Sequence, residues 1–285
     1  MWWYLNTIID AEKSAIVGGS NNTIGSWQSF SFIGGWNLHS INGMYAFIGG
    51  WYGHTADFWS SVVWWDDNTA TWWLSFVWGG RWNSATWSHA TIVGWWNNRA
   101  IGDYSFIWGG TENIVNHSSF VWGWQQNIDR GWFSVIAWWR NNQTLWMNAS
   151  IWWWESNTAS GDYATIPGGH QNQAYGVASF AAGKQARALH NNTFVRNDGS
   201  LNPFSSTISN MFLINASNGV AINTNQRISW SNAALTINGS INANLPAFND
   251  DADALAGWLA AGDFYQTNGS WSAPLNVPGI VMVKQ

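Results

Sequence analysis

A β-branched aliphatic residue recurs along this chain at intervals of 14 to 16 residues. The series, which ends on one alanine, is Val17, Ile33, Ile48, Val63, Val77, Val93, Ile107, Val121, Ile136, Ile151, Ile166 and Ala181. A period near 15 residues is typical of one turn of a β-solenoid and is too short for a helical repeat or a propeller blade. The spacing predicts an all-β, parallel β-solenoid of about 12 turns of ~15 residues.

The neighbours of this series indicate that both faces of the repeated strand are buried. Two residues earlier each turn carries a small residue, such as Ser31 or Ala46, and residues two apart in a strand share a face. The residue between them points the other way and is usually apolar too. These residues are Ile16, Phe32, Phe47, Val62, Phe76, Ile92, Phe106, Phe120, Val135 and Phe180. A monomer does not leave so long an apolar stripe exposed, so we expect self-association along the solenoid.

Asparagine opens the return segment of most turns. It occurs at Asn22, Asn68, Asn83, Asn98, Asn113, Asn127, Asn142, Asn157 and Asn172. Small or apolar residues follow two positions later, at Ile24, Ala70, Ala85, Ala100, Val115, Ala159 and Ala174. Asparagines stacked in register form ladders of amide hydrogen bonds, which we expect at this corner.

The 28 tryptophans stand where neighbouring turns have glycine. One turn reads Gly34-Gly35-Trp36 and another Trp108-Gly109-Gly110, while a second corner alternates between residues such as Gly43 and Trp59. Three interpretations are open: UGA codons that mean glycine in the organism of origin, a deliberate aromatic redesign, or natural aromatic ladders that stack on sugar rings or ice. The first is favoured, because the apolar columns, where large side chains are wanted, contain no tryptophan. If the chain carries tryptophan, we expect most of it at turns, with the rings pointing outward.

Composition excludes several classes of protein. Only 9% of the 285 residues are charged and the net charge is −5, so no basic groove for nucleic acid is expected. The absence of cysteine excludes disulfides, thiolate metal sites and a cysteine nucleophile. No segment has the length and apolarity of a membrane span. The N-terminus lacks the basic region and apolar core of a signal peptide, so we expect a fragment or a protein released by lysis.

Two regions are expected. Residues 1–196 form the solenoid, and 197–285 form a C-terminal cap or trimerisation region that is rich in β-strands. The expected strands of this cap lie near 211–214, 219–222, 235–237, 240–242 and 278–283. One short helix is predicted over 250–261, because Asn249 or Asp250 can cap its N-terminus and Gly262 ends it.

The segments 157–169 and 172–180, with their Asn-x-Ala-x-Gly pattern and a following small–apolar–apolar run, resemble the head repeats of trimeric autotransporter adhesins. The resemblance covers residues 1–196 and implies a left-handed β-roll, three chains wound about a common axis, and a role in adhesion. The turns here favour 15 residues rather than the slightly shorter family repeat, and no coiled-coil stalk or anchor barrel follows. The tail 272–285 resembles the ends of phage tail-fibre and surface-fibre proteins.

Histidines offer the strongest metal candidates. His39 and His54 lie at one position of neighbouring turns, and His89, Asp103 and His117 follow on three consecutive turns. Two imidazoles and a carboxylate in a row are able to hold a divalent ion. Exposed polar residues at solenoid corners give the same pattern, so we expect no metal site.

Other motifs lack the spacing that their chemistry needs. The pairs 66–67 and 250–251 are both Asp-Asp, but neither has the ligand spacing of a calcium loop, so turn and cap roles are expected. The segment 176–184 is flanked by glycine but does not match a phosphate-binding loop. No Ser/His/Asp set stands apart from the repeat. We therefore expect no catalytic residues, no cofactor and no enzyme activity.

The leading hypothesis is a structural adhesin or attachment-fibre protein that presents a rigid, multivalent trimeric β-roll at a bacterial cell surface or virion. Its expected partners are two further copies of the chain and a host-cell receptor, matrix protein or glycan, without nucleic acid and without membrane insertion. One alternative is a polysaccharide depolymerase of the phage tailspike type, which the sparse acidic residues disfavour. Another is a carbohydrate- or ice-binding solenoid, if the tryptophans are genuine. Threonines at 23, 69, 71 and 91 look too scattered for a flat ice-binding array.

Overall fold

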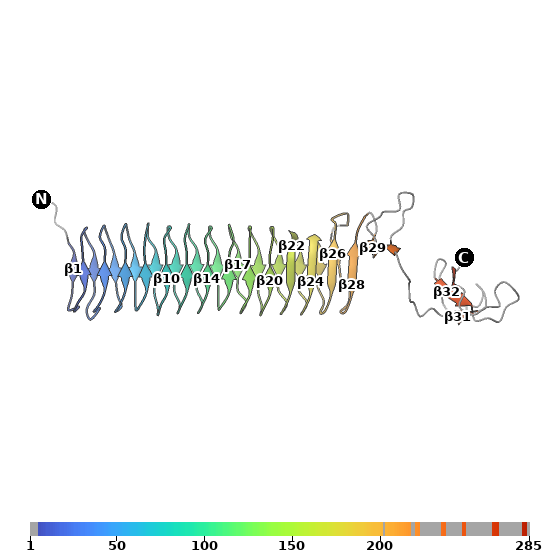
Figure 1. Ribbon diagram of the computed structural model, residues 1–285, viewed down its shortest axis with the longest axis horizontal. Helices are drawn as coiled ribbons and strands as arrows, with labels where there is room; N and C mark the ends of the chain where they lie inside the picture. Colours follow the sequence, from blue (N-terminus) through green and yellow to red (C-terminus); the bar gives the residue numbers. More distant parts are fainter. Residues whose placement is uncertain are drawn as a thin grey trace. The chain divides into compact units, whose positions relative to one another are not determined.

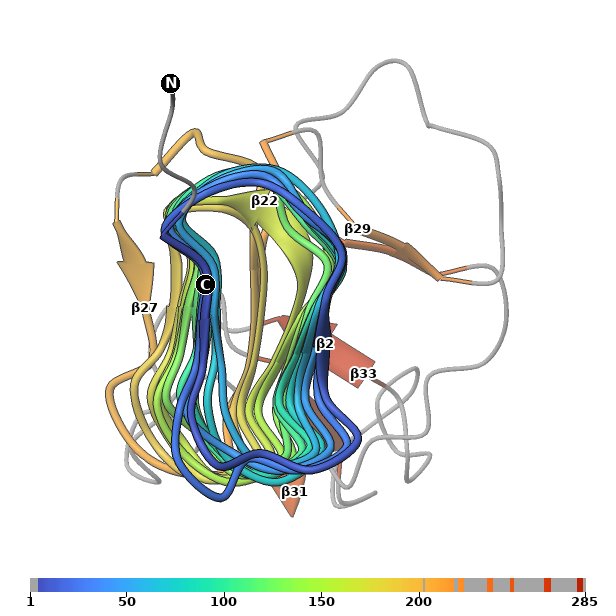
Figure 2. The same ribbon diagram turned by 90° about the vertical axis from the view of Figure 1, so that its left-hand side faces the viewer.

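The computed structural model describes residues 5–201 and 203–217 with their side chains, and beyond them the backbone of five short strands. The chain divides into two compact units, Met1–Gly219 and Val220–Gln285. The first unit is a parallel β-solenoid, which confirms the fold class that the repeat predicts. Figure 1 shows its coils stacked along one direction, and Figure 2 looks along the stack.

Each turn contributes one strand to each of two 14-stranded parallel sheets, which we call the odd sheet and the even sheet after their strand numbers. The odd sheet consists of β1 (Thr7–Ile8), β3 (Thr23–Ile24), β5 (Ser40–Ile41), β7 (Thr55–Ala56), β9 (Thr69–Ala70), β11 (Ser84–Ala85), β13 (Arg99–Ala100), β15 (Ile114–Val115), β17 (Ile128–Asp129), β19 (Gln143–Thr144), β21 (Thr158–Ala159), β23 (Gln173–Ala174), β25 (Ala186–Ala188) and β27 (Phe204–Ser205). The even sheet consists of β2 (Ala15–Ile16), β4 (Phe32–Ile33), β6 (Phe47–Ile48), β8 (Ser61–Val62), β10 (Phe76–Val77), β12 (Thr91–Ile92), β14 (Phe106–Ile107), β16 (Phe120–Val121), β18 (Val135–Ile136), β20 (Ser150–Ile151), β22 (Thr165–His170), β24 (Phe180–Lys184), β26 (Phe194–Asn197) and β28 (Phe212–Asn215).

The inner side of the even sheet carries one large aliphatic residue per turn. The members with no exposed surface are Ile33, Ile48, Val62, Val77, Ile92, Ile107, Val121, Ile136, Ile151, Ile166 and Ala181. Most of the series that the sequence predicts is confirmed, but the predictions for Val17, Val63 and Val93 are wrong. Ile16, Val62 and Ile92 take those places in the strand register, and Val17 is 67% exposed.

These three errors have one physical cause. In each of these turns two β-branched residues are adjacent, and the turns vary in length by a residue or more. Side chains alternate between the faces of a strand, so a slip of one residue moves a side chain from the core to the surface. Val62 pairs in the even sheet with Ile48 and Val77 on the neighbouring turns, so Val62 rather than Val63 points into the core.

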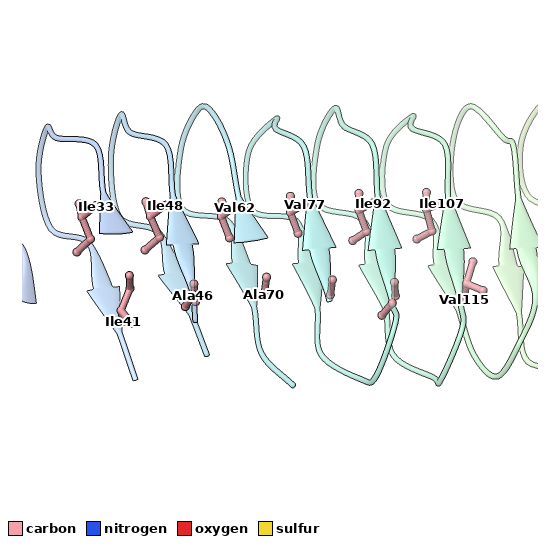
Figure 3. Packing of buried hydrophobic residues seen from close by; sticks show 14 of the residues in the cluster. Ile33, Ile41, Ala46, Ile48, Val62, Ala70, Val77, Ile92, Ile107 and Val115 are labelled. Atoms are coloured by element: carbon pink, nitrogen blue, oxygen red, sulfur yellow. The ribbon is translucent and has the colours of Figure 1, made fainter. Parts of the chain in front are cut away.

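The inner side of the odd sheet carries mostly small residues opposite this aliphatic row. Its buried members are Ile24, Ile41, Ala56, Ala70, Ala85, Ala100, Val115, Asp129, Thr144, Ala159, Ala174 and Ala188. Figure 3 shows Val77 and Ile92 of the even sheet stacked in line, with Ala70 and Val115 set in the opposite wall. Large residues facing small ones fill the narrow interior without a second layer of side chains.

The expected asparagine ladder is present at the corner before the odd sheet, and all nine predicted asparagines are fully buried. The backbone N–H of Asn83 donates to Oδ1 of Asn68 at 3.0 Å. Its own Nδ2 donates to the carbonyl oxygens of Gly79 and Trp95, both at 2.8 Å. With the backbone N–H of Asn98 as a third partner, the Asn83 side chain pairs one backbone group of its own turn and two of the next turn, which an apolar residue would leave unpaired.

The stacked sheets continue beyond residue 196, where the sequence analysis sets the end of the solenoid, and finish with β27 and β28. In the second unit β29 (Val220–Ile222) pairs in parallel with β30 (Leu235–Ile237). A further sheet joins β31 (Ala247–Phe248), β32 (Phe264–Thr267) and β33 (Val281–Val283). The strands expected near 211–214, 219–222, 235–237 and 278–283 are therefore found. The helix predicted over 250–261 and the strand at 240–242 lie outside the described residues.

Candidate functional site

The outer side of the even sheet is an apolar surface that follows the solenoid from turn to turn. Its first row is Ala15, Phe32, Phe47, Ser61, Phe76, Thr91, Phe106, Phe120, Val135, Ser150, Thr165 and Phe180. Its second row, two residues further along each turn, is Val17, Gly34, Gly49, Val63, Trp78, Val93, Trp108, Trp122, Ala137, Trp152 and Pro167. Neither row contains a charged residue. We call these two rows together the even outer face.

Phenylalanines on the even outer face stack on one another along the solenoid. The ring centroids of Phe32 and Phe47 lie 5.5 Å apart, and those of Phe106 and Phe120 lie 5.1 Å apart. Phe47 is 39% exposed and the other three are half-buried. The predicted stripe is therefore present and partly exposed, although Ser61 and Thr91 interrupt the phenylalanines. The sequence led us to expect Val62 and Ile92 on this outer row instead of Ser61 and Thr91. The cause is the register error described above.

The outer side of the odd sheet is polar by contrast. Its row is Thr7, Thr23, Ser40, Thr55, Thr69, Ser84, Arg99, Ile114, Ile128, Gln143, Thr158, Gln173 and Arg187. Thr23 and Thr69 belong to one hydroxyl row rather than to scattered positions, so that part of the sequence analysis is corrected. The row two residues further along the turns starts Ile9, Gly25, Asn42 and Asp57 and has no regular hydroxyls.

The tryptophans lie at the turns with their rings outward, as expected. Among the described tryptophans all are exposed except Trp138, which is half-buried. Many stack on the next turn, as Trp36 does on Trp51 with centroids 5.3 Å apart. Two grooves open between these rings. One of about 550 Å³ is lined by Trp64, Trp65, Trp78 and Trp95, with Gly79 and Gly80 at its floor, and the other, of about 360 Å³, lies around Gly109 and Gly110.

His39 and His54 stack as predicted, with ring centroids 5.0 Å apart, but both rings are buried and hydrogen-bonded. They occupy two places in the asparagine ladder. Nε2 of His54 lies 2.8 Å from the carbonyl oxygen of Gly50, and Nδ1 accepts the backbone N–H of Asn68 at 3.2 Å. Burial lowers the pKa of both imidazoles, to about 4 for His54. The neutral rings thus replace asparagine amides, and neither ring nitrogen of His54 is free for a metal.

The second histidine set does not form one row. His89 stacks on Tyr104, with centroids 4.5 Å apart, so it lies in the column next to Asp103. The expected position of His89 is wrong by one residue because it was counted from Val93, whereas Ile92 is the residue in register. His117 stacks on Trp132 instead. In the described parts of the chain, no three His, Asp or Glu side chains gather in a metal-binding group.

The remaining sequence candidates have local partners or lie elsewhere. Asp66 forms an ion pair with Arg81 at 3.0 Å, and Oδ2 of Asp67 accepts the indole N–H of Trp82 at 3.2 Å. Residues 250–251 lie outside the described residues. Lys184 ends β24, so residues 180–184 of the segment 176–184 are part of the even sheet.

One buried acidic residue, Asp129, was missed by the sequence analysis. It lies in the inner row of the odd sheet with no exposed surface, and its Oδ1 accepts hydrogen bonds from Ser134 and from the backbone of Gly131. Its Oδ2 has no partner within the described residues. Burial raises the pKa of Asp129 to about 7. A sequence signal for this position exists: Asp129 lies two residues after Asn127, the same spacing as the buried small or apolar residues of the other turns.

No family model and no curated protein matches this chain. Within the part that the structure describes, no helix has the length and apolarity needed to cross a membrane.

Proposed function

We propose that this chain is a structural adhesin or attachment-fibre protein that works by multivalent presentation rather than by catalysis. Three copies would assemble with their even outer faces toward a common axis. The resulting rod would stand at a bacterial cell surface or on a virion. The partners we propose are a host-cell receptor, a matrix protein or a glycan.

The observation that carries this proposal is the contrast between the two outer faces. The even outer face has no charged residue over eleven turns, while the first row of the odd outer face has Thr, Ser, Gln and Arg at all positions but Ile114 and Ile128. Apolar surfaces larger than a few hundred Å² mark interaction sites in soluble proteins. Further copies of the chain are the natural occupants. A second solenoid has the same spacing between turns, so each residue of its apolar row, such as Phe106, can lie beside the same row of the first copy.

Length and repetition supply the mechanical part of the function. Fourteen strands per sheet at roughly 4.8 Å give a rod on the order of 65 Å along the solenoid. The asparagine ladder links backbone groups of this corner from turn to turn, as Asn83 does with Trp95 and Asn98, and these bonds stiffen the rod. Three copies of a weak surface site on such a spacer bind with an avidity about 10² to 10⁴ times that of a single copy.

Assembly is tested with single cysteines, because the chain has none of its own. Ser61→Cys lies on the even outer face and keeps every phenylalanine, and the matched control Ser84→Cys lies on the odd outer face. With a short bifunctional thiol reagent, Ser61→Cys gives covalent dimers and Ser84→Cys does not. Sedimentation equilibrium of the unmodified chain gives the mass of three copies. A one-copy mass overturns the proposed assembly, and a two-copy mass overturns its threefold symmetry.

A second candidate, carbohydrate binding, has the two tryptophan-lined grooves in its favour. Indole rings stack on the apolar faces of sugars, and the groove beside Arg81 also offers a polar partner. A glycan array probed with the chain and with Trp78→Ala distinguishes the two functions. Binding that is lost in Trp78→Ala favours a carbohydrate site at this groove, whereas unchanged binding leaves recognition to other surfaces of the fibre.

A further inference from the structure

One corner of the solenoid is built from a dipeptide that contains only glycine and tryptophan over eleven consecutive turns. We call it the corner pair. Its members are Gly18-Gly19, Gly35-Trp36, Gly50-Trp51, Trp64-Trp65, Gly79-Gly80, Gly94-Trp95, Gly109-Gly110, Gly123-Trp124, Trp138-Trp139, Trp153-Trp154 and Gly168-Gly169. From Ser20 to Arg140 the residue after each pair forms a single bridge with the neighbouring turn, and His170 pairs with Lys184, so these pairs lie in register.

Both carbonyl groups of the corner pair hold the ladder asparagines in place. Nδ2 of Asn83 donates to the first carbonyl of its own turn, at Gly79, and to the second carbonyl of the next turn, at Trp95. Nδ2 of Asn98 does the same with Gly94 at 3.0 Å and Gly110 at 2.6 Å. Glycine and tryptophan therefore perform one backbone task at one place.

The second residue of the pair adopts a left-handed backbone conformation in ten of the eleven turns, and Trp124 is the exception. Its φ is +84° at Gly19, +89° at Gly80, +88° at Gly110 and +105° at Gly169. At the six other tryptophans of this position φ lies between +64° at Trp139 and +90° at Trp51. A residue with a Cβ is strained here by roughly 1 kcal/mol or more, and glycine is not.

The glycines of this position also leave no room for a side chain. A Cβ at Gly80 would overlap the carbonyl oxygen of Trp95, and a Cβ at Gly110 would overlap that of Gly123. At Gly19 the obstacle is the carbonyl oxygen of Trp36. Turns that carry tryptophan have to move these backbones apart.

That adjustment is visible in the hydrogen bonds at the first residue of the pair. The ladder Nδ2 lies 2.8 Å from the carbonyl oxygen of Gly79, 3.0 Å from that of Gly94 and 2.9 Å from that of Gly109. It is 3.0 Å at Gly18 and 3.1 Å at Gly168, against 3.1 Å at Trp64, 3.2 Å at Trp138 and 3.4 Å at Trp153. No glycine of this position has a longer bond than any tryptophan, and the two ranges meet at 3.1 Å.

Left-handed geometry alone does not restrict a position to two residue types. A second left-handed column, at the opposite corner, has φ between +45° and +62°. Its members are Lys13, Phe30, Tyr45, Trp59, Leu74, His89, Tyr104, Ser118, Phe133, Asn148, Tyr163, Ala178, Asn192 and Asn210. This column accepts many side chains, and it includes Trp59, which the sequence analysis assigned to a glycine corner. The corner pair differs because it accepts only the smallest and the largest residue.

We infer that the functional protein has glycine at the tryptophan positions of the corner pair, because the corresponding codons are UGA and the organism of origin reads UGA as glycine. A position that requires glycine uses its synonymous codons interchangeably along a repeat. If such a gene is translated with a table in which UGA means tryptophan, the position shows an irregular mixture of glycine and tryptophan and no other residue. The corner pair has that mixture.

The two tryptophan-lined grooves follow from the same cause. Each lies where a glycine pair, Gly79-Gly80 or Gly109-Gly110, interrupts a row of indole rings. With glycine at every pair, the corner-pair rings are gone from the grooves, and of the lining tryptophans only Trp78, Trp108 and Trp122 remain. This inference is independent of the proposed oligomer, because neither row of the even outer face contains a member of the corner pair.

Two measurements test the inference. The intact mass and peptide sequence of the protein from its native source are expected to show glycine at residues 64–65, 138–139 and 153–154; tryptophan there overturns the inference. In a recombinant chain, replacing these six tryptophans by glycine is compared with replacing them by alanine, which removes the rings equally. We expect a melting temperature higher by on the order of 10 °C in the glycine series. Equal melting temperatures in the two series also overturn it.

Discussion

The odd and even sheets share their strand number, direction and period, yet they treat their two faces differently. The even sheet buries large aliphatic residues inside and presents an apolar face outside. The odd sheet buries small residues and faces solvent with hydroxyl, amide and guanidinium groups. All three buried titratable residues of the described chain, His39, His54 and Asp129, lie on the odd sheet or in the ladder that leads into it. The comparison indicates that the even sheet supplies most of the apolar core, while the odd sheet carries the pH dependence; the assembly proposed above would use the outer face of the even sheet.

The sharpest way to break this comparison is a pair of substitutions at neighbouring residues of β14. Ile107→Ala opens a cavity in the filled interior, so we expect a loss of about 2 to 5 kcal/mol of unfolding free energy. Phe106→Ala removes an outward ring and is expected to weaken assembly more than folding. Chemical denaturation and sedimentation of both variants check the difference. Equal effects on folding would show that the two faces of the even sheet are not distinct.

A smaller effect is expected from Asp129→Asn. Burial raises the pKa of this carboxyl from 3.8 to about 7, so between these values the folded chain holds a proton that the unfolded chain releases. Unfolding free energy therefore decreases as pH rises from about 4 to about 7, by a few kcal/mol at about 1.4 kcal/mol per pKa unit. Asp129→Asn removes this decrease and raises the melting temperature at pH 8. An unchanged pH profile of thermal unfolding would contradict the buried position of this carboxyl.

The histidine pair is expected to act in the opposite direction. The pKa of His54 is lowered from 6.5 to about 4, so below pH 6.5 the unfolded chain takes up a proton that the folded chain does not. Unfolding free energy falls as pH drops from about 6.5 to about 4, by roughly 3 kcal/mol. His54→Asn, which restores the residue found on most other turns, should flatten this acid limb and leave stability at pH 8 nearly unchanged. Urea titrations at several pH values measure both effects, and a retained acid limb would count against the ladder role.

The smallest effect is expected at the surface. Asp66→Asn breaks the exposed ion pair with Arg81 and should cost less than about 1 kcal/mol, decreasing further in high salt. The melting temperature at low and high salt measures it. A larger loss of unfolding free energy that salt does not reduce would mean that Asp66 and Arg81 stabilise the solenoid as much as residues of the two sheets do.

Much of the solenoid could be predicted because its repeat leaves a mark at nearly every turn. Ile107 and its equivalents, and asparagines such as Asn83, stand at spacings that only a stacked coil explains. The functional candidates were predicted less well. His39 and His54 stack as the spacing implies, but the spacing does not reveal that their nitrogens are used by the backbone. His89 and His117 were aligned by counting from a residue that is not in register.

The sequence by itself determined the period, the parallel coil, the asparagine ladder and the irregular exchange of glycine and tryptophan. These features repeat at equivalent positions of successive turns, so they can be recognised by comparing the turns in the sequence. Only the tertiary structure decided between Val62 and Val63, because a choice of face depends on the hydrogen bonds to the turns above and below. It also decided that the coil continues to Asn215 and that Asp129 lies inside it. Burial and the pKa shifts that follow from it arise from the surroundings of a side chain, and a single turn of sequence does not contain them.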